Sequence, residues 1–553
     1  MITIHFRSPT PYPWTIKLKE LKIVSILNLK GHILNHIELF AGCGGLSLGL
    51  EKAGFSLAIA NELSPMAAET FAYNLLGEDL DQLASQELAP KKTFWLSSAF
   101  DELKPRLREN PFQYPKLGDG YSTMPTDPAQ LEGKLVVANI IQLNEFLIKN
   151  PTYLSAIKSN FGKGGIDLIS GGPPCQIFSL AGLREKNSDK NSLPWEFANF
   201  AELVQPKIVV LENVSGILRP FTEGDSKYYA WLEVAKVFAS KGYVPVCVHI
   251  NARNVGVAQN RPRFIMIAVR EDIYSNINTA FNEVEQQIFK PAFAFFQAIQ
   301  KGKQHENYTY LDFSNPLHEQ LFNGSFLAHL VTGKSTTVRD AIDDLKFETP
   351  AAPSSFIKEL NKTFAPIIKK GRTLHNHEPR SNNEQVRRRF RLYQVMLSCS
   401  RTASAEVAGI LKGESNELSA SSWAELRKFS YLQRNGKQSP FNSKHAFIDF
   451  ISNHQTKKRT QKALDGNNPA PAALSIPDDT CHYDEGELRT LTVREMARIQ
   501  SFPDAFRFRS KITTGGQMRR FEVPQYTQVG NAVPPLLGLA IGKCVIDLLT
   551  RAN

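Results

Sequence analysis

The sequence predicts an α/β fold, an open, doubly wound mixed sheet with helices on both faces, and three observations support this prediction. Short apolar segments typical of buried strands alternate with helical segments from residue 36 to about 270. The first strand leads into a glycine-rich turn, and a later one leads into a Gly-Pro loop. Strands are expected at 36–40, 56–60, 135–138, 166–170, 207–211, 243–250 and 263–269.

The glycine-rich turn spans residues 41–47 and leads into a helix expected at 46–53. Backbone N–H groups in such a turn can meet an adenosyl cofactor, although glycine turns also serve tight packing. The second strand ends at Asn61 and Glu62. An acidic side chain roughly 20 residues after the glycines can accept hydrogen bonds from both ribose hydroxyls. Ser47 replaces the third glycine of the dinucleotide fingerprint, which argues against NAD.

A single thiol follows the Gly-Pro loop. Gly171 and Gly172 let the backbone turn, and Pro173 and Pro174 stiffen it just before Cys175. Free cysteine is usually a small buried hydrophobe. Cys175, however, lies beyond a strand end, where open α/β sheets bind their ligands. This position favours a nucleophile held in a fixed orientation.

Two other strand ends carry charged side chains. Glu212 follows the strand at 207–211 and can act as a proton donor, the alternative being a solvated strand terminus. Arg261 and Arg263 alternate along the chain, so their guanidinium groups are expected to project in the same direction. A surface row of arginines is the alternative interpretation.

Composition limits the possible classes of protein. With 553 residues, of which 42% are apolar, the chain can bury more than one core, and its net charge of +11 favours a polyanionic partner. The six cysteines are scattered and form no Cys-x-x-Cys pair, so we expect neither a metal site nor disulfides. Unpaired cysteines are typical of proteins in a reducing cytosol, where we expect this protein to be. No signal peptide and no membrane-spanning segment is expected.

Seven motifs make the chain resemble the DNA (cytosine-5) methyltransferases. They occur in the order found in that family and lie at 40–45, 61–62, 172–176, 212–214, 259–263, 491–495 with 500–503, and 530–535. The resemblance covers residues 36–270 and 488–545 and fades between them. It implies an S-adenosylmethionine-dependent methyltransferase fold, a smaller target-recognition domain, and transfer of a methyl group to carbon 5 of a flipped-out cytosine in a specific DNA sequence.

The resemblance also implies roles for individual residues. Cys175 would form a covalent adduct at carbon 6 of the ring, with Glu212, Arg261 and Arg263 as the other catalytic residues. Asn139 replaces an aspartate of the family pattern, which puts in doubt the strength of the contact to the adenine. The expected contacts to S-adenosylmethionine are Phe40, Ala41, Gly42, Gly44, Gly45, Leu46, Glu62, Leu63, Asn139, Ile140, Pro173, Asn531 and Ala532. The expected DNA contacts are Gln176, Ser179, Gln259, Arg387, Arg388 and Arg389.

The resemblance divides the chain into an extension (1–30), a catalytic domain (31–270, with an insertion at 75–134 that projects from the sheet), a target-recognition domain (271–487) and a segment that returns to the catalytic domain (488–553). In the last segment, helices are expected at 491–500 and 536–549. The expected partners are double-stranded DNA and a cognate restriction endonuclease, for a monomer in the bacterial cytosol. A tRNA cytosine-5 methyltransferase and an inactive DNA-binding relative remain alternatives.

Overall fold

The computed structural model describes residues 33–174, 193–223, 226–303, 308–368, 374–458, 461–472 and 480–552. The described residues from Leu34 onward form one compact unit. The predicted extension at 1–30 lies outside the described residues.

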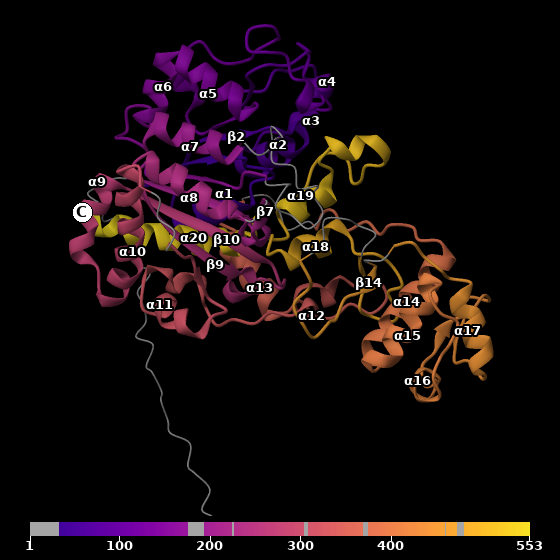
Figure 1. Ribbon diagram of the computed structural model, residues 1–553. Helices are drawn as coiled ribbons and strands as arrows, with labels where there is room; N and C mark the ends of the chain where they lie inside the picture. Colours follow the sequence, from indigo (N-terminus) through magenta and orange to yellow (C-terminus); the bar gives the residue numbers. More distant parts are fainter. Residues whose placement is uncertain are drawn as a thin grey trace, which may run out of the picture. The chain divides into compact units, whose positions relative to one another are not determined.

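A nine-stranded sheet is the centre of the unit that begins at Leu34 (Figure 1). Its order is β11-β9-β10-β6-β5-β1-β2-β4-β3, and β10 alone runs antiparallel to the other strands. The strands are β1 (Asn35–Leu39), β2 (Ser56–Glu62), β3 (Thr93–Trp95), β4 (Lys134–Val137), β5 (Leu168–Gly171), β6 (Ile208–Val214), β9 (Tyr243–Asn251), β10 (Pro262–Arg270) and β11 (Leu311–Asp312). The predicted fold class is confirmed, and each predicted strand is present within about three residues of its expected bounds.

Packed elements cover the middle of this sheet on both faces. Every residue of β1 and β5 is buried, although successive side chains point to opposite faces. The first helices are α1 (Gly45–Ala53), α2 (Pro65–Phe71), α5 (Ile140–Lys149), α6 (Pro151–Lys158), α7 (Leu193–Val204), α8 (Ala230–Ser240), α9 (Glu271–Ile277) and α10 (Glu283–Gln300).

Residues 75–134 correct one expectation, because they do not simply project from the sheet. They include the helices α3 (Leu80–Ser85) and α4 (Leu103–Arg106), and β3 pairs in parallel with β4 as the edge strand. The Trp95 side chain is fully buried in a cluster that includes residues of α2, α3 and α4. A three-residue strand is too short to give a readable alternation, so the sequence did not reveal it.

The C-terminal helix α20 (Pro535–Leu549) packs directly on α1, so it returns to the first part of the sheet, as the resemblance implied. Glycines allow the two backbones to approach closely. A Cβ at Gly49 would lie 2.4 Å from the backbone nitrogen of Leu539, and a Cβ at Gly542 would lie 2.6 Å from the Cβ of Ala53. The chain therefore leaves the catalytic sheet and returns to its first helix at the C-terminal end.

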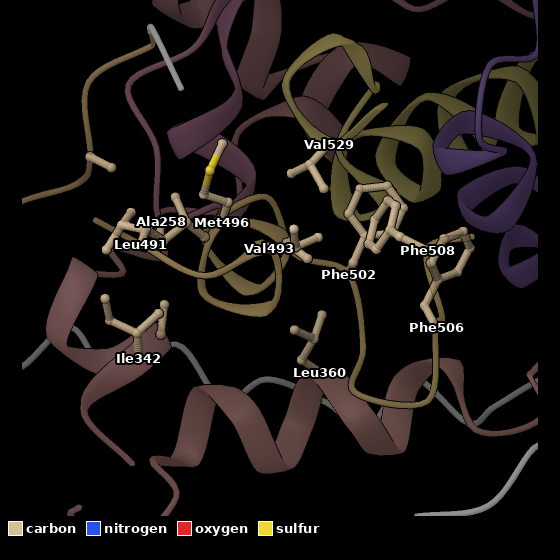
Figure 2. Close-up of a cluster of buried hydrophobic side chains, with 14 of the residues drawn as sticks. Ala258, Ile342, Leu360, Leu491, Val493, Met496, Phe502, Phe506, Phe508 and Val529 are labelled. Atoms are coloured by element: carbon tan, nitrogen blue, oxygen red, sulfur yellow. The ribbon is translucent and has the colours of Figure 1, made fainter. Parts of the chain in front are cut away.

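A second buried cluster joins the returning segment to the middle of the chain (Figure 2). Leu491, Val493 and Met496 lie in it together with Leu360 of α13 (Ser355–Phe364). Phe502, Phe506 and Phe508 extend the cluster, with ring centroids 4.8–5.2 Å apart. Two other helices contribute residues to it, α12 (Val338–Ile342) and α18 (Val493–Ile499).

A third cluster is built mainly from residues between 390 and 488. Its helices are α14 (Glu384–Ser398), α15 (Arg401–Lys412), α16 (Ala420–Leu426) and α17 (Lys444–Ser452). By contrast, α10 packs on β9 and α8, and α11 (Glu319–Asn323) packs on α10. Part of the predicted recognition segment thus packs on the catalytic sheet, and the functional division at 271 and 487 stays a prediction.

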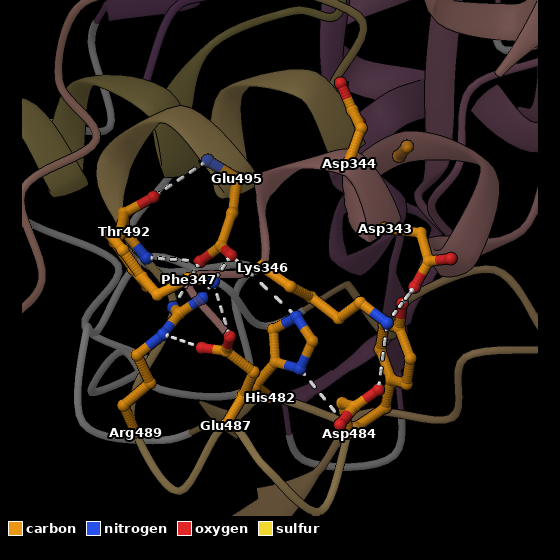
Figure 3. A network of polar contacts seen from close by, with 12 residues as sticks. Asp343, Asp344, Lys346, Phe347, His482, Asp484, Glu487, Arg489, Thr492 and Glu495 are labelled. Carbon is orange, nitrogen blue, oxygen red and sulfur yellow. Dashed lines mark hydrogen bonds and ion pairs between the residues drawn. The ribbon is translucent and has the colours of Figure 1, made fainter. Parts of the chain in front are cut away.

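A buried ion pair connects this third cluster to α18 (Figure 3). The guanidinium of Arg489 binds both carboxylate oxygens of Glu495, at 2.8 and 2.7 Å, and lies 4.6 Å from the centroid of the Phe347 ring. Glu495 also completes a capping box with Thr492 at the start of α18. The charge-assisted hydrogen bonds thus fix Arg489 to the start of α18, and the cation–π contact brings Phe347, which is distant in sequence, to the same place.

In the described part of the chain, no single helix is long and apolar enough to cross a membrane; one strongly bent pair, 516–531 with 535–549, meets the length and hydropathy criteria together.

Candidate active site

The predicted site residues gather where the parallel strands end. β1 lies between β5 and β2, so the chain order reverses at this strand. At such a point the loops from neighbouring strands diverge and leave a crevice at their carboxyl ends, where ligands of doubly wound folds bind. The glycine turn follows β1, Glu62 ends β2, Asn139 follows β4, and the Gly-Pro loop follows β5.

The glycine turn and Glu62 form one hydrogen-bonded unit. The backbone N–H of Gly42 donates to Oε2 of Glu62 at 2.7 Å, and the N–H of Ser64 donates to Oε1 at 2.8 Å. Burial raises the pKa of the Glu62 carboxyl group, while the hydrogen bonds from the backbone oppose the shift. A Cβ at Gly42 would meet no atom within 4 Å, so the turn borders open space beside this carboxyl group. This geometry fits an acceptor for ribose hydroxyls.

Residues of the returning segment press on the same turn. A Cβ at Gly45 would lie only 2.3 Å from the carbonyl oxygen of Val533, so only glycine fits there. Asn531, at the end of α19 (Gln525–Asn531), is exposed, and Ala532 is half-buried. Both lie within three residues of Val533, which contacts Gly45, so residues 530–535 return to the glycine turn, as the resemblance implied.

The structure places the remaining predicted cofactor residues at the same strand ends. Phe40 is half-buried with φ at 54°, Ala41 and Leu46 are buried, and Gly44 has φ at 94°. Asn139 caps α5, because its Oδ1 accepts the N–H of Ile141 at 2.9 Å. The amide oxygen keeps a second lone pair for another donor. Leu63 is half-buried, and Ile140 and Pro173 are buried.

Tyr114 is a residue at this edge that the sequence analysis missed. Its hydroxyl donates to the carbonyl oxygen of Leu63 at 3.0 Å, and burial raises its pKa well above the usual value. The segment that carries it has no periodic pattern, so no sequence signal pointed to this contact.

Glu212 and Arg263 form a buried ion pair beside the Gly-Pro loop. Nε of Arg263 lies 2.5 Å from Oε1 of Glu212, and both residues are less than 10% exposed. A Cβ at Gly172 would lie 3.1 Å from Oε2 of Glu212, so the glycine lets the loop approach the carboxylate. Nδ2 of Asn213 donates to the carbonyl oxygen of Pro173 at 3.1 Å and ties the loop to β6. The predicted neighbours Glu212, Arg263 and Pro173 are therefore brought together.

Arg261 has partners that differ from those of Arg263. Its Nη2 donates to the carbonyl oxygens of Gly530 and Ala532, at 2.8 and 2.9 Å. The expectation that both arginines project towards the base was based on strand alternation, but β10 begins after Arg261, at Pro262.

Cys175, Gln176 and Ser179 lie outside the described residues, so their predicted roles stay predictions. The described cysteines are Cys43, Cys247, Cys399, Cys481 and Cys544. Four of them are buried and Cys399 is half-buried, and burial raises the pKa of each thiol. A raised pKa disfavours the thiolate that nucleophilic attack requires, so none of the five is a good competitor for that role.

The predicted DNA contacts fare differently. Gln259 is fully buried, and its Nε2 donates to the carbonyl oxygen of Pro471 at 3.1 Å, so in this arrangement it cannot reach DNA. Arg387 is exposed on α14. Arg388 pairs with Glu384 at 2.5 Å, and Arg389 donates to the carbonyl oxygen of Gln455 at 3.4 Å. Only one of the three adjacent arginines is thus fully available to a phosphate.

Comparisons with known proteins identify the family of this chain. A family model described as C-5 cytosine-specific DNA methylase matches residues 34–94 and 150–547, which is most of the chain. Over 535 residues the chain is 26% identical to the Type II methyltransferase M.DdeI of Desulfomicrobium norvegicum, covering 94% of this chain and 92% of that protein.

Two more relatives extend this comparison. The Type II methyltransferase M.Bpa9945I of Bacillus paralicheniformis is 26% identical over 548 residues, covering 93% of this chain and 98% of that protein. DNA (cytosine-5)-methyltransferase 3 of Arabidopsis thaliana is 26% identical over 537 residues, covering 95% of this chain and 31% of that protein. The chain therefore belongs to the C-5 cytosine-specific DNA methylase family and is a DNA (cytosine-5-)-methyltransferase.

Proposed function

We propose that this enzyme transfers the methyl group of S-adenosylmethionine to carbon 5 of a cytosine flipped out of duplex DNA, through a transient bond between Sγ of Cys175 and carbon 6. Carbon 5 of cytosine is a poor nucleophile until a thiolate adds at carbon 6 and converts the ring to an enamine. The target atom is inaccessible inside a duplex, so the base has to leave the stack, at a cost of a few kcal/mol.

The observation that carries the proposal is the Glu212–Arg263 ion pair beside Gly172 and Pro173. Cys175 follows this loop by two residues, so its thiol and the Glu212 carboxyl group would reach one ring from neighbouring strand ends. Glu212 would donate a proton to ring N3 as the thiolate adds, and Arg263 would hold the carboxyl group in place. When the adduct collapses, solvent water accepts the proton from carbon 5, the thiolate departs from carbon 6, and the proton on ring N3 returns to the Glu212 carboxylate.

S-adenosylmethionine fits the residues of the glycine turn. It supplies a methyl group on a sulfonium leaving group. Glu62 would accept hydrogen bonds from the ribose hydroxyls, since its carboxyl group is fixed by Gly42 and Ser64. Phe40, half-buried at the start of the turn, would pack on the adenine. Asn139 would accept the adenine amino group with its second lone pair.

The names of the relatives support a biological setting for the activity. Two of them are called type II methyltransferases. We place this chain in a restriction–modification system, where it would protect DNA from a cognate endonuclease. Residues 271–487 would select the DNA sequence, because base edges have to be read by a surface other than the pocket for one cytosine.

Replacing the thiol tests the proposal. Cys175→Ser should abolish methyl transfer to duplex DNA, because a hydroxyl is a much weaker nucleophile, and should leave S-adenosylmethionine binding nearly unchanged. Transfer of a radiolabelled methyl group and calorimetric titration of the cofactor measure the two effects. Cys399→Ser, at a half-buried cysteine, is the matched control and should keep full activity. Appreciable turnover by Cys175→Ser would disprove the covalent mechanism.

A further inference from the structure

The helix α19 ends in carbonyl groups that it cannot pair by itself. The N–H of Ala532 donates to the carbonyl oxygens of Gln528 and Val529, at 3.1 and 3.3 Å. The last carbonyls of a helix have no later N–H within the helix and need other donors. Nε2 of Gln500 donates to the carbonyl oxygen of Val529 at 2.7 Å, and Nη2 of Arg261 donates to the carbonyl oxygens of Gly530 and Ala532. Side chains from two other segments thus close this helix end.

Arg261 is held rigidly for this task. Its backbone N–H donates to Oδ1 of Asn251 at 2.8 Å, and its carbonyl oxygen accepts the N–H of Ala252 at 3.0 Å. Only 4% of the residue is exposed. Burial, and then the nearby Arg263, lower the pKa of its guanidinium well below the usual value, while Glu212 opposes the shift. The negative end of a helix favours a cation, which partly offsets this desolvation.

The turn that Arg261 holds is also confined by the glycine turn. The carbonyl oxygen of Val533 lies against Gly45, so the 530–533 turn cannot move towards the glycine turn without a clash. Asn531 lies between the two carbonyl groups that Arg261 binds, and its side chain is exposed. The hydrogen bonds from Arg261 and the close approach of Val533 to Gly45 therefore restrict the position of Asn531.

We infer that Arg261 is a positioning residue which caps α19 and fixes the 530–533 turn beside the glycine turn, so that cofactor affinity depends on it more than the methyl-transfer step does. The inference rests on the proposed function, in which Asn531 and Ala532 contact S-adenosylmethionine. It separates the two arginines by role, because Arg263 binds Glu212, whereas Arg261 joins two parts of the catalytic fold that lie 269 residues apart in the sequence.

Three variants test this assignment. Arg261→Gln removes the charge and cannot serve both carbonyl groups in the same geometry, so the Kd for S-adenosylmethionine should rise at least tenfold. Arg261→Lys keeps a cation near the helix end and should recover part of the affinity. Arg263→Gln is the matched control, since it should lower kcat at saturating cofactor while changing the Kd less than threefold. Calorimetric titration gives the Kd, and KM and kcat are measured with duplex DNA.

The outcomes separate a positioning role from a merely structural one. An Arg261→Gln protein with the cofactor Kd of the wild type would overturn the inference, as would a loss of kcat without a change in the cofactor KM. If Arg261→Gln does not fold, Arg261→Lys decides the question by the same Kd. A wild-type protein that does not bind S-adenosylmethionine would instead disprove the proposed function.

Discussion

The packing of α1 on α20 gives a prediction in which two effects oppose each other. Gly49 lies inside α1, where alanine would favour the helix by roughly 1 kcal/mol. A Cβ there, however, would lie 2.4–2.5 Å from backbone atoms of Pro535, Gly538 and Leu539. An ordinary contact begins near 3.4 Å, so the helices would have to separate by about 1 Å. Backbone atoms cannot rotate away, and overpacking of this kind costs about 1–3 kcal/mol.

We therefore expect Gly49→Ala to lower the free energy of unfolding by up to about 2 kcal/mol, because the steric cost of about 1–3 kcal/mol outweighs the gain of roughly 1 kcal/mol in helix propensity. Urea unfolding, followed by circular dichroism and by tryptophan fluorescence, measures the change and tests for intermediates. Because α20 follows the 530–533 turn, the affinity for S-adenosylmethionine should fall as well.

Gly409 provides the matched control. It lies inside α15, and a Cβ there would meet only the Cβ of Ser415, at 3.8 Å. Gly409→Ala should therefore stabilise the protein by up to about 1 kcal/mol through helix propensity alone. If Gly49→Ala stabilises the protein by a similar amount, then the two helices do not pack as closely as described and the steric argument is wrong.

Three further predictions concern charged groups. Glu62→Ala should raise the KM for S-adenosylmethionine more than it lowers kcat, and the reverse pattern would remove Glu62 from the cofactor site. Burial raises the pKa of Glu38 to about 8, so above pH 4.5 the unfolded chain loses a proton that the folded protein keeps, and stability falls up to about pH 8. Glu38→Gln should therefore raise the unfolding midpoint more at pH 7 than at pH 4.5, and an equal gain at both pH values would contradict the shift. Arg387→Ala should reduce the slope of log DNA affinity against log salt concentration by up to about 1, and Arg388→Ala should reduce it less, because Glu384 already pairs with Arg388. If both variants keep the slope of the wild type, neither arginine contacts a phosphate.

Some parts of the site could be predicted because local chemistry decides them. The turn at 41–47 needs glycine where φ is positive, as at Gly44, and where another backbone comes close, as at Gly45. Glu62 ends a strand that is apolar and alternates with a helix, so its place at the sheet edge follows from the fold class. The contact between Glu212 and Arg263 was implied by the family resemblance, and the structure contains it.

The sequence could not show the partners of a side chain when they come from a distant part of the chain. Gln259 stands in a motif that suggested a DNA contact, but Pro471 covers it. Arg261 and Arg263 look equivalent in sequence, yet the C-terminal segment binds only Arg261. Arg388 and Arg389 look like free cations until Glu384 and Gln455 are placed beside them.

The sequence by itself determined the α/β class, the order of the central strands along the chain and the residues at their ends, because these depend on local apolar patterning and turn chemistry. Only the tertiary structure decided that β3 and β11 extend the sheet, that Tyr114 reaches the carbonyl oxygen of Leu63, and that Arg261 caps α19. These features depend on contacts between segments tens to hundreds of residues apart. A buried backbone carbonyl needs a hydrogen-bond donor, and that donor can come from any segment that packing brings close. The local sequence pattern does not show which segment that is.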